Sequence, residues 1–366
     1  MSRQVYLDWN ATTPPLSAVV DAMAETARHA WGNPASVHSS GRRARDVVET
    51  AREEVALLVG ASARDVIFTS GGTEANNLAL HRAPALVTSQ LEHPSVTRVA
   101  EVLEAEGRPV RWLPVPSSGC LSPAALADAL VGLPPGTLVA VAPANHETGV
   151  VQPLQALAEV TQQAGARLHV DAVQTVGKLP SSVLTVADTL SLAAHKIRGP
   201  KGIGALVHRP DRAPQPLLRG GSQERGRRPG TVDPVAAAGF RVAAAWARAN
   251  LSEREPLRLL RDQLEAALLR KGALVNGGEA TRLSHITNVS IPGHAGDELV
   301  AALDLLGVAV SSGSACSAGT TEPSKVISAM LGVERARGAV RISLGDATTG
   351  LDIEFAQKAL ERVLRS

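Results

Sequence analysis

Lysine is scarce in this chain, which has 6 lysines against 31 arginines in 366 residues. Arginine carries most of the positive charge, but it cannot serve where the chemistry needs an amine that gives up its proton. One lysine, Lys196, ends an apolar run in LSLAAHKIRGPKGIGAL, residues 190–206, directly before a Gly/Pro turn. A lysine in a turn is ordinarily a surface residue, so the residues around it must decide its role.

Cysteine and net charge are also low, and each shortage excludes a class of protein. Two cysteines, Cys120 and Cys316, do not make a disulfide framework, which favours the cytoplasm. A net charge of +2 creates no strong field for nucleic acid or a membrane. The sequence has no signal peptide and no apolar run of membrane length. We therefore expect a cytoplasmic protein that binds neither a membrane nor, directly, a nucleic acid, and no metal site.

Short apolar runs alternate with helical patterns along the first two thirds of the chain. The runs, rich in Val, Ile and Leu, lie at 65–69, 85–89, 110–115, 137–142, 167–171, 188–193 and 203–208. Helix starts are marked between them, as at Ser122-Pro123 before AALADAL. This alternation predicts an α/β fold with a mostly parallel sheet covered by helices on both faces.

The pattern changes after about residue 250. A long helical pattern is followed by short strand patterns near 285–291 and 339–344 among further helices. We predict a large α/β domain over residues 15–250. A smaller α+β domain is predicted from residues 1–14 and 251–366.

Polar residues follow the predicted strands, where ligands of open parallel sheets bind. After the first run, Gly71 and Gly72 allow a tight turn and Thr73 opens a helix whose free N–H groups can hold a phosphate. His93 follows the next run in LEHPSV. Each feature alone is more often structural, because many such turns only connect elements and a single histidine is usually a cap or a core residue.

Two later strand ends add an amide and a carboxylate. Asn145 stands in NHETGVVQP, and Asp171 ends its run in RLHVDAVQTVGKLP with Gln174 close behind. An aspartate in an apolar run is costly to bury without a positive partner. With Lys196 at the next strand end, the set fits pyridoxal 5'-phosphate: phosphate on the helix end, aspartate on the pyridine nitrogen and lysine as a Schiff base.

At this point the chain resembles a known family, the cysteine desulfurases of the NifS/IscS type, which are pyridoxal-phosphate enzymes of the class V aminotransferase fold (fold type I). The motifs that carry the resemblance span almost the whole chain: YLDWNATTP, GNPASVHSSGRRAR, FTSGGTEANNLA, NHETGVVQPL, HVDAVQTVGKLP, AAHKIRGPKGIGAL, RRPGTVDP, SSGSACSAGTTEPS and RISLG.

The resemblance implies a role for each cofactor residue. Lys196 would form the Schiff base, Asp171 would pair with the ring nitrogen, and His93 would stack on the ring. Gln174 and Asn145 would contact the ring oxygen. Thr73 and His195, with the turn at Gly72, would contact the phosphate.

The resemblance also implies a homodimer and a substrate site. Thr231 would reach the cofactor phosphate of the neighbouring subunit. Asn33 and Arg341 would hold the substrate carboxylate, which suits the two-pronged geometry of arginine.

Cys316 separates a desulfurase from an ordinary aminotransferase. It lies in SSGSACSAGTTEPS, a stretch of small residues with few apolar anchors, whereas a core cysteine would lie among Val, Leu and Ile. From the residues alone it is either an inert loop cysteine or a nucleophile, and the resemblance favours the nucleophile. The spacing to Glu322-Pro323-Ser324 resembles the longer-loop desulfurases. Cys120, in SSGC, is expected to be structural.

The implied activity is the conversion of L-cysteine to L-alanine, with the sulfur left as a persulfide on Cys316. A sulfur-acceptor protein, either a scaffold or a sulfur carrier, would take it for iron-sulfur clusters, thiolated tRNA or a sulfur-containing cofactor. Lys196 would take the Cα proton. A free thiol has a pKa of about 8.5, so the thiol needs help to ionise, and His93 is the candidate to accept or relay its proton. Two alternatives stay open: another class V enzyme, such as an aminotransferase or a selenocysteine lyase, and a non-enzymatic regulatory partner that binds the cofactor.

Three features depart from the family pattern. Ala193 stands where family members commonly have a serine that bonds the phosphate, so cofactor affinity is expected to be lower unless other contacts compensate. His146 stands where asparagine is usual. The sequence stops at Ser366, where housekeeping members carry a further segment that engages an iron-sulfur scaffold, so the resemblance leaves open whether a scaffold is the acceptor here.

Overall fold

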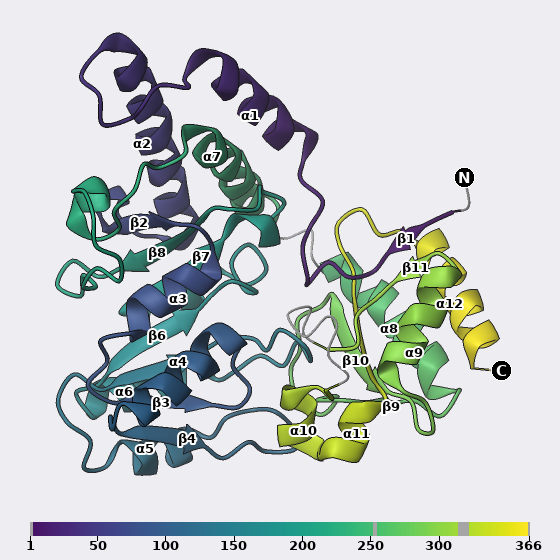
Figure 1. Ribbon diagram of the computed structural model, residues 1–366. Coiled ribbons are helices and arrows are strands. Elements are labelled where there is room, and N and C mark those ends of the chain that lie inside the picture. The colour runs from purple at the N-terminus through teal and green to yellow at the C-terminus, as the bar shows by residue number, and fades with distance from the viewer. Residues whose placement is uncertain (1–2, 252–254, 314–321, 365–366) are drawn as a thin grey trace.

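A seven-stranded sheet forms the centre of the larger of two bodies in the computed structural model, which describes residues 3–251, 255–313 and 322–364 (Figure 1). Its order is β2-β8-β7-β6-β5-β3-β4. β8 is antiparallel to both of its neighbours, and β7, β6, β5, β3 and β4 pair in parallel. The bounds are β2 Val66–Thr69, β3 Leu86–Ser89, β4 Val110–Leu113, β5 Leu138–Val141, β6 Arg167–Asp171, β7 Thr189–Ala193 and β8 Gly204–His208. The predicted mostly parallel sheet is confirmed.

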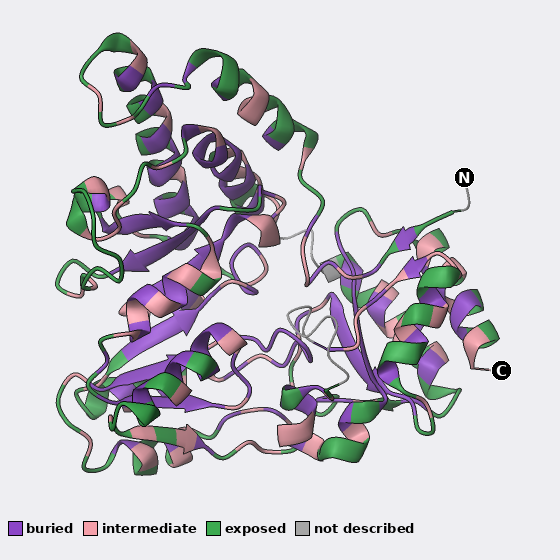
Figure 2. Cartoon of the chain, in the orientation of Figure 1, coloured by how far each residue is buried: buried purple, intermediate pink, exposed green. Residues whose placement is uncertain are grey.

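Helices cover both faces of this sheet. Successive residues of a strand point to opposite sides, and here both sets are apolar and need cover. On β5, Leu138 and Ala140 pack in a core with α4, whereas Val139 and Val141 pack in the core that includes α2, α6 and α7. Figure 2 shows most of these strands as buried along their length, and the edge strand β4 is partly exposed. The helices of this body are α1 Ser17–His29, α2 Ser39–Val59, α3 Gly72–Leu80, α4 Pro94–Ala105, α5 Pro123–Leu130, α6 Leu154–Gln163 and α7 Pro234–Ala249.

A second body has its own core and two small sheets. β12-β10-β9 form one sheet, and β1 pairs in parallel with β11 in the other. Leu7 near the N-terminus packs in one core with Leu264 and Ile342 from the C-terminal part. The strands are β1 Val5–Tyr6, β9 Leu274–Val275, β10 Ile286–Ser290, β11 Val308–Ala309 and β12 Ala339–Ser343, and the helices are α8 Glu255–Leu269, α9 Gly296–Leu305, α10 Lys325–Leu331, α11 Val333–Arg337 and α12 Gly350–Val363.

The predicted strands near 285–291 and 339–344 correspond to β10 and β12. Three further strands, β1, β9 and β11, have two residues each, too few for a period-two pattern to be visible. The predicted domain boundaries at residues 14/15 and 250/251 stay a prediction.

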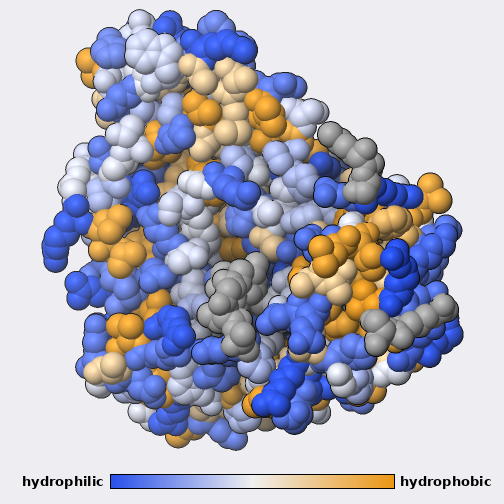
Figure 3. Space-filling model, turned by 45° about the vertical axis from the view of Figure 1, so that its right-hand side comes forward, coloured by the Kyte–Doolittle hydropathy of each residue, from blue (hydrophilic) through white to orange (hydrophobic). Residues whose placement is uncertain are grey.

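The surface is mixed, and the part of the chain that the structure describes includes no helix with the length and apolar character needed to cross a bilayer. Figure 3 shows one face on which hydrophobic residues are interspersed with hydrophilic ones. Isolated exposed apolar residues such as Trp31 and Leu305 are normal on a folded protein.

A buried ion pair ties the segment after β8 to the start of the sheet. Arg52 of α2 binds both carboxylate oxygens of Glu224 at 2.7 and 2.8 Å, and the Phe68 N–H donates to the same carboxylate at 2.8 Å. Glu224 and Arg225 both have left-handed backbones, with φ of 48° and 57°. The ion pair therefore offsets local backbone strain in this segment.

We expect Glu224→Gln to lower the free energy of unfolding by about 3 kcal/mol in urea denaturation, because Arg52 would stay buried without its full countercharge. Arg52 retains Glu49 at 3.2 Å, which keeps the loss at the lower end of the range for broken buried pairs. The control is Glu54→Gln, which removes a surface pair with Arg248 and should cost less than about 1 kcal/mol. Equal losses would contradict a special role for the buried pair.

Candidate active site

One cavity of about 190 Å³ opens at the carboxyl ends of the parallel strands, between the two bodies. Parallel strands end at the same edge of a sheet, so residues far apart in sequence meet there. The predicted site residues among its lining are Gly72, Thr73, His93, Asp171, Gln174, His195, Lys196 and Arg341.

Lys196 lies in a 3-10 turn, Ala194–Lys196, that begins directly after β7. Its ammonium donates to the backbone carbonyls of Asn10 and Ala11, the latter at 3.0 Å. The Asn10 carbonyl also accepts from Gln174 Nε2 at 3.0 Å. The N-terminal segment therefore crosses the site and holds two of the predicted residues.

Asp171 is the last residue of β6 and is 7% exposed. Its Oδ2 accepts from Asn76 Nδ2 at 2.8 Å, and its Oδ1 accepts from the Val173 N–H at 3.1 Å. These neutral donors satisfy part of the buried carboxylate and leave its remaining lone pairs for a group in the cavity.

His93 caps the N-terminus of α4. Its Nδ1 accepts from the Ser95 N–H at 3.1 Å and lies 2.8 Å from Ser95 Oγ. Burial lowers the pKa of His93, and the positive charge of Lys196 adds to this while the Asp171 carboxylate opposes it. His93 is therefore held as a neutral imidazole near neutral pH.

Two other histidines of the cavity are also kept neutral. Burial lowers the pKa of His195 to about 4, helped by the nearby positive charges of Lys196, Lys201 and Lys178. Burial lowers the pKa of His146 well below its usual value, and its ring meets that of His93 edge-on at 5.5 Å between centroids. The site is thus lined with imidazoles that can donate or accept one hydrogen bond without carrying charge.

The start of α3 lines the cavity and is closely packed against the segment after β6. A Cβ on Gly72 would lie 2.6 Å from Val173 Cγ2 and 3.8 Å from the Ala193 Cβ, so only glycine fits at this turn. Thr73, the next residue, is exposed at the helix start. The free N–H groups of a helix start favour an anion.

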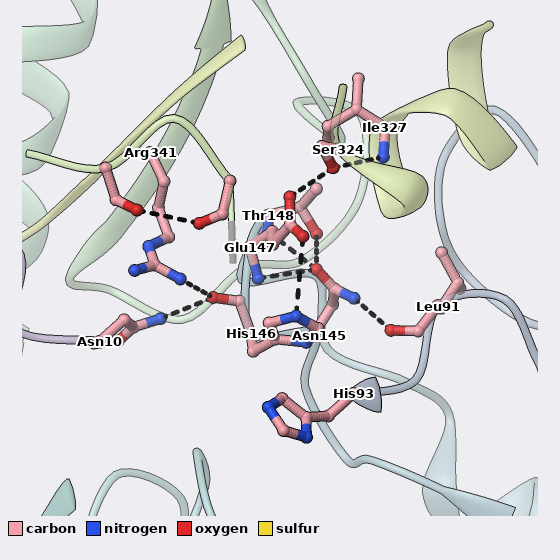
Figure 4. Close-up of polar contacts among 12 residues, drawn as sticks. Asn10, Leu91, His93, Asn145, His146, Glu147, Thr148, Ser324, Ile327 and Arg341 are labelled. Carbon is pink, nitrogen blue, oxygen red and sulfur yellow. Dashed lines mark hydrogen bonds and ion pairs between the residues drawn. The ribbon is translucent and has the colours of Figure 1, made fainter. Parts of the chain in front are cut away.

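Arg341 reaches the cavity from β12 of the smaller body, and Figure 4 shows it beside Asn10 and His146. The side chain is 2% exposed, with Nη2 bound to Asp8 Oδ1 at 2.8 Å and Nη1 to the His146 carbonyl at 3.2 Å. Its Nε–H is buried and has no partner among the described residues. A buried guanidinium with an unused donor is suited to hold a carboxylate.

Asn145 lies outside the lining of the cavity. Its Oδ1 accepts from the N–H groups of Glu147 and Thr148 at 2.9 Å, and its Nδ2 donates to the Leu91 carbonyl at 2.8 Å (Figure 4). In this structure the amide therefore organises the turn after β5 and ties it to the segment after β3.

Two other predicted residues are not brought to the cavity. Asn33 lies between α1 and α2, where its Oδ1 accepts from the Ala35 N–H at 2.9 Å. Thr231 is exposed before α7. Cys316 lies outside the described residues. Cys120 is a free, partly exposed cysteine away from the cavity lining.

Sequence reasoning missed four residues that organise the site: Asp8, Asn10, Asn76 and Ser95. They lie inside the quoted motifs YLDWNATTP and FTSGGTEANNLA and the stretch LEHPSV. A polar residue in an apolar helical pattern, as Asn76 is in EANNLAL, was a usable signal, because burying an amide requires partners.

Comparison with known proteins finds relatives that match this chain over nearly its full length. The family model of class V aminotransferases matches residues 5–355. Cysteine desulfurase IscS of Dictyoglomus turgidum is 38% identical over 377 residues, which cover 100% of this chain and 95% of that protein. A cysteine desulfurase of Cereibacter sphaeroides is 42% identical over 374 residues, covering 99% and 96%. The solved structure of a NifS-like protein from Rickettsia africae has a TM-score of 0.91 at 30% identity and covers 100% of both chains.

We expect Gly72→Ala to lower the free energy of unfolding of the ligand-free protein by about 1–3 kcal/mol, because the new methyl group would overlap Val173. Urea denaturation measures the loss. The control is Gly350→Ala at the start of α12, where a Cβ meets nothing within 4 Å and stability should be unchanged or slightly raised. A loss of the same size at both glycines would contradict the steric argument.

Proposed function

This chain belongs to the class V aminotransferase family, among its cysteine desulfurases, and we propose that it converts L-cysteine to L-alanine and passes the sulfur, as a persulfide on Cys316, to an acceptor protein. The observation that carries the proposal is the meeting of Lys196, Asp171, His93 and the start of α3 around one cavity, with Arg341 entering from the second body. A pocket without a cofactor would have no use for an amine, a buried carboxylate and a helix start at one place.

The family depends on pyridoxal 5'-phosphate, and the residues present fit it. The cavity offers a lysine, a buried carboxylate with unused lone pairs and a helix start at which a Cβ has no room. When bound, the cofactor supplies a sink for the electrons left behind when the substrate Cα loses its proton.

Each of these groups has a separate task toward the cofactor. Lys196 would hold it covalently, and Asp171 would accept a hydrogen bond from the protonated ring nitrogen. Gly72, Thr73 and His195 would hold the phosphate from the other side of the site. Gln174, whose amide is oriented by Asn10 and Lys178, would contact the ring oxygen, with Asn145 shaping the turn behind it.

The guanidinium of Arg341 would bind the carboxylate of L-cysteine. Its two Nη groups are already fixed by Asp8 and the His146 carbonyl, so the side chain is oriented before the substrate arrives. The buried Nε–H gains a partner when the substrate binds. Asn33 is the second residue that we propose for the carboxylate.

Proton and sulfur transfer use Lys196 and Cys316. Lys196 would take the Cα proton, because its amine lines the cavity in which the substrate would be bound. The Cys316 thiolate would then attack the substrate sulfur: an S–S bond forms, the C–S bond breaks, and the carbon skeleton is protonated to alanine. Thr231 would contribute to the phosphate site of a second copy in a homodimer.

We expect Cys316→Ala to change the absorbance of the bound cofactor when L-cysteine is added, while alanine and sulfide production fall by at least about a hundredfold. The substitution removes the nucleophile and leaves the cofactor residues in place. Cys120→Ala is the control and should retain both the absorbance change and the production of alanine and sulfide. Full turnover by Cys316→Ala, or a persulfide found by mass spectrometry on Cys120, would overturn the proposed sulfur transfer.

Ala193→Ser should tighten binding of pyridoxal 5'-phosphate by up to about tenfold or leave it unchanged, because a hydroxyl at this position adds a charge-assisted hydrogen bond. The Ala193 side chain lines the cavity close to the start of α3, so a hydroxyl there lies beside the proposed phosphate site. Fluorescence titration of the cofactor-free protein measures the dissociation constant. A clear weakening would show that the proposed phosphate site lies elsewhere.

A further inference from the structure

One amide in the wall of the cavity makes hydrogen bonds on all sides. Asn76 of α3 is 1% exposed, and its Nδ2 donates to Asp171 Oδ2 and to Ser95 Oγ, both at 2.8 Å. Its Oδ1 accepts from Ser191 Oγ at 2.5 Å and lies 3.0 Å from His169 Nε2. Because a carboxylate only accepts, Asp171 fixes which end of the amide is nitrogen.

That orientation fixes the proton on His169 as well. Asn76 Oδ1 is an acceptor, so His169 Nε2 must donate to it, and His169 Nδ1 then accepts from Thr189 Oγ1 at 2.9 Å. Burial lowers the pKa of His169 to about 4. The amide is thus held from behind by a neutral, fully buried imidazole with a single arrangement of protons.

On the other side, Asn76 sets the hydroxyl of Ser95. The Ser95 oxygen accepts from Asn76, and its own hydrogen is directed to His93 Nδ1, 2.8 Å away. The Ser95 N–H donates to the same nitrogen at 3.1 Å. A backbone N–H can only donate, so Nδ1 of His93 is unprotonated and the ring carries its proton on Nε2.

We infer that Asn76 is a positioning residue that sets the two groups on the cavity as a pair: Asp171 as an acceptor and, through Ser95, His93 as an imidazole that carries its proton on Nε2. The inference deepens the proposed function, since it concerns the same cavity. It has a consequence for the chemistry. The first proton that His93 moves at Nε2 is one that it gives, so it could accept the thiol proton of Cys316 at that atom only afterwards.

The hydrogen-bond pattern can be tested in the cofactor-free protein by ¹⁵N NMR of histidine-labelled chain, with the His93 signals assigned from their absence in His93→Asn. In the wild type we expect Nε2 to be protonated and Nδ1 to be an unprotonated, hydrogen-bonded nitrogen at neutral pH. A proton on Nδ1, or the mixture of tautomers found in free histidine, would overturn the inference. This readout does not depend on cofactor binding, so it stands or falls separately from the proposed function.

The role of Asn76 is tested by Asn76→Asp, which keeps the shape but replaces both donors with an acceptor. Ser95 should turn its hydroxyl from His93 to the new carboxylate, which moves the Nδ1 resonance toward that of an unbonded nitrogen. Two carboxylates side by side should also weaken binding of pyridoxal 5'-phosphate by about tenfold or more. Unchanged His93 signals and an unchanged dissociation constant would refute the assignment.

Two further variants keep the test decisive. Asn77→Asp places the same charge on the same helix, but its side chain bonds the Thr73 carbonyl and not Asp171, so the His93 signals should not change. Ser95→Ala removes only the hydroxyl and serves if Asn76→Asp does not fold. It should shift Nδ1 while the proton stays on Nε2, and cofactor affinity should change less than about threefold. A large loss of cofactor affinity in Ser95→Ala would contradict the inference that Asn76 acts on Asp171 and on Ser95 through separate hydrogen bonds.

Discussion

The direction of the strands is the constraint on which this site depends. The parallel strands β3, β5, β6 and β7 all end at one edge of the sheet, and each end delivers a different polar group. The strands themselves are buried and mostly apolar, and polar residues within them such as His169 and Ser191 are hydrogen-bonded to buried neighbours, so the groups open to the cavity lie at the strand ends. A carboxylate and a lysine that are 25 positions apart in the sequence, Asp171 and Lys196, therefore face one cavity.

The second body completes this edge by contacts that join distant parts of the chain. Asp8 and Asn10 from the N-terminal segment bind Arg341 of β12 and the His146 carbonyl. The Asn10 carbonyl also receives the Lys196 ammonium. The N-terminal segment thus joins the two bodies. The position of Arg341, proposed to bind the substrate, depends on the same segment as that of Lys196, proposed to bind the cofactor.

The sequence was informative where a pattern is local. All seven strands of the large sheet could be predicted within a few residues, because β-branched runs such as VIFT of β2 and buried runs such as LVAV of β5 are visible in a short window. The residues at strand ends followed from the same rule. The strands β1, β9 and β11 were missed because two residues carry no periodicity.

What the sequence could not supply was the partner of each polar group. Asn145 was predicted as a cofactor contact, yet its amide is engaged by three backbone groups of the turns around it. Asn76 was passed over, although it contacts Asp171, Ser95, Ser191 and His169. The partners of Asn76 lie 19 to 115 positions away, so only the folded chain reveals them.

His93 shows how closely chemistry and architecture are joined here. The same Nδ1 that is kept free of a proton also caps the first turn of α4, so the imidazole is part of the helix start. An alanine at this position would remove a ring from the cavity and a cap from the helix together, and its kinetics would mix a chemical loss with a frayed helix. Asparagine keeps a cap without an imidazole. The effect of the ring alone is thus the difference between the wild type and the asparagine variant, and the difference between asparagine and alanine reports the helix cap. A side chain at this position has to satisfy a helix as well as the chemistry in the cavity.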